Sequence, residues 1–86
     1  MRYKSEQVGK AIRQVRTSMR VTQHSLAMTA GTGLRFIIDL EKGKPTCELG
    51  KVLTVLNTLG IQITLTSPKG ARLEPDAEIL GQRAGE

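Results

Sequence analysis

Residues 22–43 decide the fold, and they read TQHSLAMTAGTGLRFIIDLEKG. Thr22 is a residue type that caps the start of a helix, and Gly31 stands where a left-handed residue commonly ends one. Gly33 then permits a tight turn before another helix begins. The pattern therefore predicts two short helices joined by a glycine-containing turn.

The second of these helices is expected over residues 34–41, with Ile37 and Leu40 facing inward and Gly43 closing it. Ala27 is small at the point where the first helix must cross the second closely. Since Ile37 and Leu40 anchor one face, the opposite face stays open and is able to enter the major groove of DNA. The segment has the physical logic of a helix-turn-helix.

Further helices are expected on both sides of this segment. A helix from Ser5 to about Ser18 precedes it, because apolar residues recur at helical spacing. They are Val8, Ile12, Val15 and Met19. After a break at residues 44–45, Thr46 is expected to cap a fourth helix that ends at Gly60. Its apolar stripe consists of Leu49, Val52, Leu53, Leu56 and Leu59.

Residues 61–66, IQITLT, switch to strict alternation and are rich in β-branched residues, which predicts a strand. Its alternate positions are Ile61, Ile63 and Leu65. Because the rest of the chain reads as helical, we interpret this strand as having no partner within the chain, and an unpaired edge is a liability. The simplest solution is pairing with the same strand of a second copy, with residues 1–4 as a candidate further strand.

The chain has 86 residues, enough for one small domain. Residues 1–66 are expected to form the DNA-binding and dimerisation domain. Residues 67–86 contain proline and glycine with few large apolar groups, and a flexible tail is expected there. The predicted fold class is mostly α, with four helices and one C-terminal strand.

The net charge of +5 is concentrated in the predicted domain. Residues 1–66 hold ten basic and four acidic residues, a net charge of +6, whereas residues 67–86 hold three and four, a net charge of −1. A basic body predicts an anionic partner, either nucleic acid or a membrane surface. Its basic residues are spread over several short helices, which argues against membrane binding.

Composition excludes several other classes. Aromatic residues are 2% of the chain, too few for the stacking platforms of single-stranded nucleic-acid binders. One cysteine and one histidine preclude an intrachain disulfide and a Cys/His zinc site within one chain. No catalytic arrangement has a supporting motif. We therefore expect a cytoplasmic protein, nucleoid-associated when bound to DNA, that is not an enzyme and uses neither metal nor cofactor.

The residues resemble the Xre/Cro-type helix-turn-helix family and, within it, the HipB-like antitoxins. The resemblance is carried by Thr22-Gln23, Leu26-Ala27, Ala30-Gly31 and the stretches 35–46 and 48–53, and it covers roughly residues 5–66. It implies a four-helix domain like that of lambda repressor, with a C-terminal strand pairing across a homodimer. It also implies a repressor that binds a palindromic operator at its own promoter and restrains a HipA-like kinase toxin.

The resemblance also points to individual residues. Gln23 is similar to the glutamine that binds backbone phosphate, and Arg16 and Glu41 match a structural ion pair of phage repressors. The expected phosphate contacts are Thr22, Gln23, Thr32, Gly33, Lys42 and Lys44. The expected base-reading residues are Leu34, Arg35, Ile38 and Asp39 on the outward face of residues 34–41. The expected dimerisation residues are Ile61, Ile63 and Leu65.

Several alternatives stay open. Arg35 and Asp39 are spaced for an intrahelical ion pair, which is compatible with base reading. Gly33 departs from the serine or threonine that often caps this helix, and it either loosens the helix end or lets the backbone approach DNA. The whole chain could also be a stand-alone phage-type or metabolic repressor, or a toxin-neutralising module with little DNA specificity.

Overall fold

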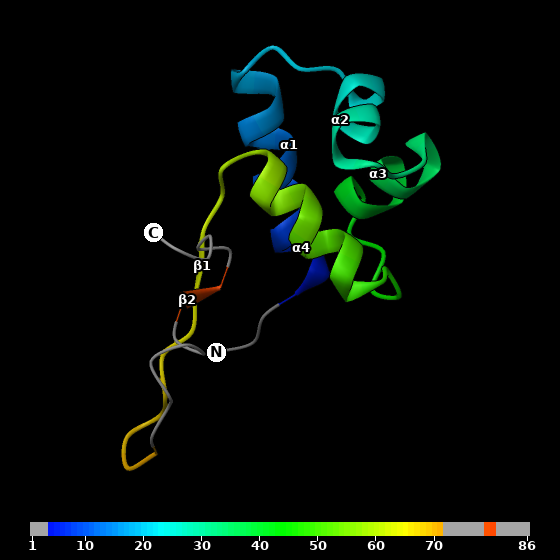
Figure 1. The fold of residues 1–86 in the computed structure, drawn as a ribbon. Coiled ribbons are helices and arrows are strands. Elements are labelled where there is room, and N and C mark those ends of the chain that lie inside the picture. The colour runs from blue at the N-terminus through cyan, green and yellow to red at the C-terminus, as the bar shows by residue number, and fades with distance from the viewer. Residues whose placement is uncertain (1–3, 72–78, 81–86) are drawn as a thin grey trace.

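The computed structural model describes residues 4–71 and 79–80 of the chain. It contains four helices, α1 (Ser5–Ser18), α2 (Gln23–Ala30), α3 (Leu34–Glu41) and α4 (Leu49–Thr58), and an antiparallel pair of short strands, β1 (Ile63–Thr64) and β2 (Ile79–Leu80). The helices form one body, from which the chain after β1 extends away (Figure 1). The prediction of a mostly helical chain with four helices is confirmed. No helix in the described part of the chain is long and apolar enough to cross a membrane.

All four helices contribute to one hydrophobic core. Its buried members are Ile12, Leu26, Ala27, Ile37, Leu40, Val55, Leu56 and Leu59. The inward positions predicted for α3, Ile37 and Leu40, are among them, and so is the small Ala27. Each large aliphatic side chain buried in this way contributes about 1.5–3 kcal/mol of transfer free energy. This core fixes which face of α3 remains outside.

Every helix ends with the same pair of backbone hydrogen bonds around a left-handed residue. After α2, α3 and α4 that residue is a glycine, as the sequence predicts; these are Gly31, Gly43 and Gly60. After α1 it is Arg20, with φ of 60°. The next N–H, that of Val21, donates to the Arg16 carbonyl at 3.1 Å. Sequence inspection missed this turn because a non-glycine residue rarely adopts positive φ.

α1 and α3 pack with their backbones in close contact. Gly9 is buried, and a Cβ there would collide with the carbonyl oxygens of Leu40 and Glu41. The Ser5 hydroxyl donates to the Gly43 carbonyl at 2.6 Å. This hydrogen bond ties the start of α1 to the end of α3. Ser5 is the first helical residue, as expected, and the cap position is occupied by Lys4.

The predicted start of α4 was wrong. Residues 45–46 form a turn, and α4 begins at Leu49 with Glu48 at the cap position instead of Thr46. Glu48 has φ of −63° and ψ of 123°, an extended conformation, so the helix does not start before Leu49. The first backbone bond of α4 then runs from the Val52 N–H to the Glu48 carbonyl at 3.1 Å.

The predicted strand is shorter than expected and has a partner in its own chain. β1 comprises two residues, and it pairs with β2 in the register Ile63 with Leu80 and Thr64 with Ile79. The interpretation that the chain offers no partner was therefore wrong, because two consecutive apolar residues within the predicted tail supply one. Residues 67–71 of the predicted tail are exposed and contain a turn at 69–70. The tail residues 72–78 and 81–86 lie outside the described residues, as do residues 1–3.

Candidate nucleic-acid interface

The α2–turn–α3 unit is built as the sequence predicts. The Thr22 hydroxyl accepts a hydrogen bond from the Ser25 N–H at 3.0 Å and so caps α2. Gly33 occupies the cap position of α3 with φ of −79°, and it provides no side-chain cap. α3 presents Leu34, which is 41% exposed, and the exposed Arg35 at its first turn. The start of α3 is thus the exposed end of the helix-turn-helix, which we call its open end.

Three charged side chains form what we call the outer charge cluster: Arg35, Asp39 and Lys44. Arg35 Nε lies 3.3 Å from Asp39 Oδ1, and Lys44 Nζ lies 3.6 Å from Asp39 Oδ2. The Arg35, Lys44 and Asp39 side chains are 75%, 53% and 20% exposed. The Lys44 N–H also donates to the Asp39 carbonyl at 3.0 Å, which holds the two residues together. The intrahelical ion pair that the sequence left open is therefore present.

Arg16 and Glu41 form a second, buried group, which we call the inner charge cluster together with Gln23. Arg16 donates from Nε to Glu41 Oε2 at 2.5 Å and from Nη2 to Oε1 at 2.9 Å. Its Nη1 donates to the Val21 carbonyl at 2.8 Å. The Arg16 and Glu41 side chains are 10% and 4% exposed. The hydrogen bond to Glu41 raises the pKa of the Arg16 guanidinium, against the opposing effect of burial. The cluster links α1 to α3.

Gln23 completes the inner cluster from the first position of α2. Its Nε2 donates to Glu41 Oε1 at 3.1 Å. The Glu41 carboxylate of α3 therefore accepts hydrogen bonds from side chains of both α1 and α2. An amide has two N–H donors, and one of them is engaged here. The hydrogen bond thus orients Gln23 without using its whole donor capacity.

A hollow of about 270 Å³ lies beside the inner cluster. It is lined by Arg13, Arg16, Gln23, Ile38, Glu41 and Lys42. The interpretation of Ile38 as an exposed residue was wrong, since it is half-buried at this hollow. Arg13 was missed as a neighbour of the predicted phosphate residues. Its spacing of three from Arg16 on α1 is the signal that would have placed both on one side of the helix.

The remaining predicted contacts surround the same region. Lys42 is exposed at the end of α3. Thr32 is half-buried, and its hydroxyl donates to the Gly33 carbonyl at 3.3 Å. Gly33 itself is exposed, with open space around the position of a Cβ.

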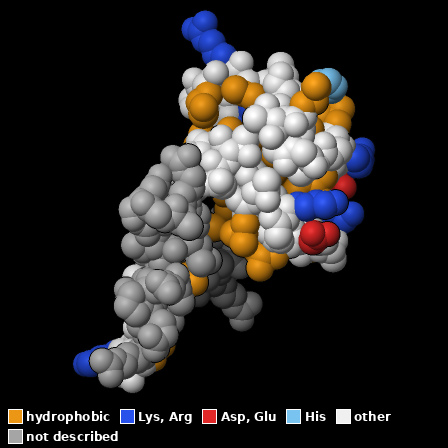
Figure 2. Space-filling model, viewed as in Figure 1, with side chains coloured by type: hydrophobic (Ala, Val, Ile, Leu, Met, Phe, Trp, Pro, Cys, Tyr) orange, Lys and Arg blue, Asp and Glu red, His pale blue; other side chains and the backbone are white. Residues whose placement is uncertain are grey.

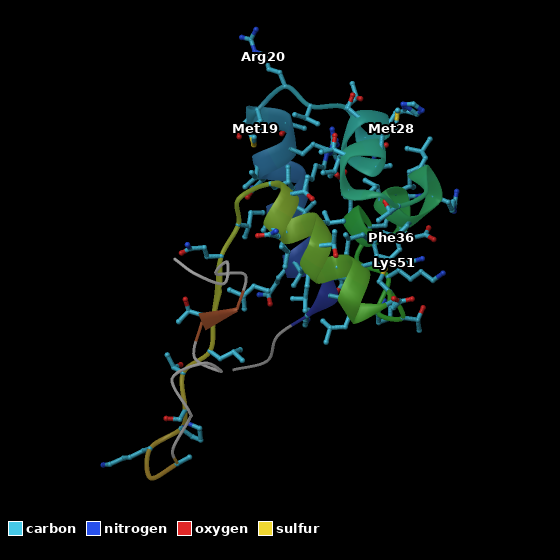
Figure 3. The ribbon with its side chains drawn as sticks, viewed as in Figure 1. Met19, Arg20, Met28, Phe36 and Lys51 are labelled. Carbon is cyan, nitrogen blue, oxygen red and sulfur yellow. The ribbon has the colours of Figure 1, made fainter. Side chains whose placement is uncertain are left out.

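Phe36 is directed toward α4. It packs against the core, and Lys51 Nζ of α4 lies 5.7 Å from the centre of its ring, within range of a cation–π contact (Figure 3). Phe36 therefore serves packing. It leaves aliphatic and charged side chains, rather than an aromatic ring, at the outward face of α3. Basic and acidic side chains lie close together on the side of the body occupied by α3 and the start of α4 (Figure 2).

A second surface feature is an apolar groove of about 380 Å³, which we call the α1–α4 groove. It is lined by Lys4, Gln7, Val8, Ala11, Leu49, Val52, Leu53, Leu56, Ile61 and Ile63. Two of the predicted dimerisation residues, Ile61 and Ile63, are therefore in this groove, and the third, Leu65, is 43% exposed. Leu49 at its rim is 68% exposed.

Comparison with known proteins identifies the family. The chain is 52% identical over 61 residues to a protein of Sinorhizobium fredii named uncharacterized HTH-type transcriptional regulator y4mF. The match covers 71% of this chain and 80% of the relative. The chain belongs to the HTH-type transcriptional regulators.

This membership agrees with the α2–turn–α3 geometry of the regulator and with the basic charge of its body. The family is one of transcription regulators and not of enzymes, as the sequence predicted. No protein-family model matches the regulator.

Proposed function

We propose that this regulator is a repressor that binds double-stranded operator DNA with α3 in the major groove. The observation that carries the proposal is the division of α3 into two faces. Ile37 and Leu40 are buried, whereas Leu34 and Arg35 stand exposed at the open end of the helix-turn-helix. A recognition helix needs this combination of anchoring and exposure.

The proposed base contacts follow from side-chain chemistry. Arg35 is suited to a bidentate contact with guanine, and Leu34 and Ile38 are suited to thymine methyl groups. Because Ile38 is half-buried, its contact would be confined to the part of the side chain that faces the groove. Asp39 is less suited to accepting from cytosine N4, because Arg35 and Lys44 engage both of its carboxylate oxygens.

The proposed phosphate contacts surround the start of α2 and the end of α3. Gln23 is held by Glu41 with a donor to spare, and Lys42 lines the hollow next to it. Thr22, Thr32, Gly33 and Lys44 complete the proposed set. Such contacts fix the register of a protein on DNA without reading the sequence.

We further propose that the regulator acts as a homodimer on a pseudo-palindrome, with its α3 helices about 34 Å apart in successive major grooves. The α1–α4 groove and the neighbouring β1 support this proposal, since an apolar surface of this kind favours a partner. In this proposal the two copies contact each other through Ile61, Ile63 and Leu65, the first two of which line the groove. β1 is already paired with β2, so a second copy would use the other edge of β1, which has no strand beside it among residues 4–71 and 79–80, or would displace β2.

Replacing Ile63 by glutamate tests the dimer. A charge in the groove should shift the protein from dimer to monomer in analytical ultracentrifugation, because an unpaired charge is costly to bury. Thr64→Glu is the matched control, since Thr64 is exposed on the other face of the same strand and should keep the dimer. An unchanged dimer for Ile63→Glu, with circular dichroism showing a folded protein, would reject this interface.

As a second role we propose that the regulator is the antitoxin of a HipA-like kinase toxin and represses its own operon in the cytoplasm. This rests on the resemblance of residues 35–46 and 48–53 to HipB-like antitoxins. Co-expression with the adjacent gene tests it. A co-purifying kinase supports the antitoxin role, and its absence favours a stand-alone repressor.

Binding to DNA is tested by a salt series on the upstream DNA of the regulator's own gene and on scrambled DNA of equal length. Specific binders prefer their operator by at least about 10³-fold. A preference of that size supports the repressor. Equal and weak binding of both DNAs, together with tight binding of a protein partner, would instead support a toxin-neutralising module.

A further inference from the structure

The outer charge cluster places one carboxylate between two cations that the proposed function assigns to DNA. Asp39 contacts Arg35 through one oxygen and Lys44 through the other. Both cations are more than half exposed, whereas Asp39 is 20% exposed. The carboxylate is therefore the most buried of the three side chains, and the two more exposed cations both contact it.

Helix stability does not explain this arrangement. Asp39 lies in the last turn of α3, where the helix dipole disfavours negative charge. The order of the pair, with Arg35 four residues before the acid, is also the less stabilising of the two orientations. Exposed pairs of this kind contribute little to folding. We therefore look for the role of Asp39 in binding rather than in folding.

We infer that Asp39 is a specificity-determining residue that acts as a built-in counter-ion for Arg35 and Lys44. This inference rests on the proposed function. On non-operator DNA the carboxylate competes with phosphates for both cations and so weakens binding. On the operator, the two terminal nitrogens of Arg35 gain a bidentate guanine contact that is absent elsewhere, while Nε keeps its contact with Asp39, so Arg35 binds there without losing its ion pair.

The physical consequence is a wider gap between specific and non-specific affinity. Non-specific binding comes from cations that neutralise phosphates and release counter-ions. A carboxylate that occupies those cations lowers this sequence-independent affinity for every DNA. Specificity is a difference of affinities, and it increases when the wrong complex is penalised more than the right one.

Asp39→Asn tests the inference, because it keeps the shape of the side chain and removes its charge. Wild type and variant are compared on operator and scrambled DNA over a series of salt concentrations. Each cation released to a phosphate makes the slope of log binding constant against log salt concentration steeper by about 0.9. With one or two cations released, scrambled DNA should bind roughly tenfold more tightly at low salt, with a slope steeper by about 0.9–1.8. The operator should gain less than about threefold, so the specificity ratio falls.

Glu48→Gln is the charge-matched control. Glu48 is an exposed acid at the start of α4, and its replacement makes the same change in net charge without touching Arg35 or Lys44. We expect it to change the affinity for scrambled DNA by less than about twofold, as a screened surface charge should. An equal gain in both variants would show that net charge alone is responsible and would overturn the inference.

Two other results would also overturn it. A loss of operator affinity in Asp39→Asn with unchanged scrambled binding would make Asp39 a base-reading residue, and the proposed repressor would stand without the counter-ion. If neither affinity changes in a variant that circular dichroism shows to be folded, Asp39 is neither a counter-ion nor a base-reading residue, and the inference is rejected. Asp39→Ser, which also lacks the charge, repeats the test with a different side chain. Failure of the wild type to prefer its operator is a separate result and rejects the proposed function itself.

Discussion

α3 carries two clusters built from the same chemistry, an arginine bound to a carboxylate, and the two differ in burial. The inner cluster joins Arg16 to Glu41 through two hydrogen bonds, with 10% and 4% of the side chains exposed. The outer cluster joins Arg35 to Asp39 at 3.3 Å, with 75% and 20% exposed. Residues 39 and 41 are two apart on a helix, so they do not share a face.

This difference separates architecture from function. Breaking a buried ion pair leaves an uncompensated charge in the interior and costs about 3–5 kcal/mol. An exposed pair contributes about 0–1 kcal/mol, because water and salt screen it. The inner cluster is therefore part of the fold, whereas the outer cluster can exchange its partners at little cost. The same helix thus holds a permanent contact and an exchangeable one.

The largest effect is expected from Arg16→Ala. The substitution leaves Glu41 buried without its cation and removes the bond to the Val21 carbonyl, so the free energy of unfolding should fall by about 3 kcal/mol or more. Urea unfolding followed by circular dichroism measures it. Arg13→Ala, an exposed position on the same helix, should change stability by no more than about 0.5 kcal/mol. A loss below about 1 kcal/mol for Arg16→Ala would mean that burial does not distinguish the two clusters.

Arg35→Ala should give the opposite pattern. Its effect on the free energy of unfolding should stay below about 0.5 kcal/mol, because the pair with Asp39 is exposed. Operator binding should weaken by about 1–3 kcal/mol and become less selective at one base pair. Titrations on operator and scrambled DNA check this, with Lys44→Ala as the companion variant that should weaken both DNAs about equally. An equal loss on both DNAs for Arg35→Ala would remove Arg35 from the base-reading residues.

The Arg16–Glu41 pair of the inner cluster could be anticipated from a family resemblance, but the bond from Gln23 to Glu41 and the geometry of the outer cluster could not. Periodicity and glycine positions predict the four helices, and the spacing of Arg35 and Asp39 predicts their pair. Lys44 joins that pair only because the turn at Gly43 bends the chain back, with its N–H on the Asp39 carbonyl. The spacing of residues in the sequence does not show that the chain reverses direction at Gly43.

Other features of the structure could not be predicted from the sequence for similar reasons. The backbone contact at Gly9 depends on how closely α1 approaches α3, which is a tertiary property. Ile38 was expected outside because helical periodicity alone does not show the hollow that α1 and α2 form beside it. The partner of β1 lies 15 or more residues away in a segment without a clear strand pattern. In each case the deciding contact is non-local.

The smallest effect is expected from Gly33→Ser, at the start of the helix that carries both clusters. Gly33 has φ of −79° and open space around a Cβ, so serine fits without strain and supplies the missing cap, which should stabilise the protein by a few tenths of a kcal/mol. Thermal unfolding measures that gain, and titration with operator and scrambled DNA measures the cost at the interface. If the bare backbone at Gly33 lies against a phosphate, both affinities should fall together, because a phosphate contact carries no sequence information. If both affinities stay constant while stability rises, glycine merely loosens this end of α3. A loss confined to the operator would contradict both interpretations and would place position 33 among the residues that read bases.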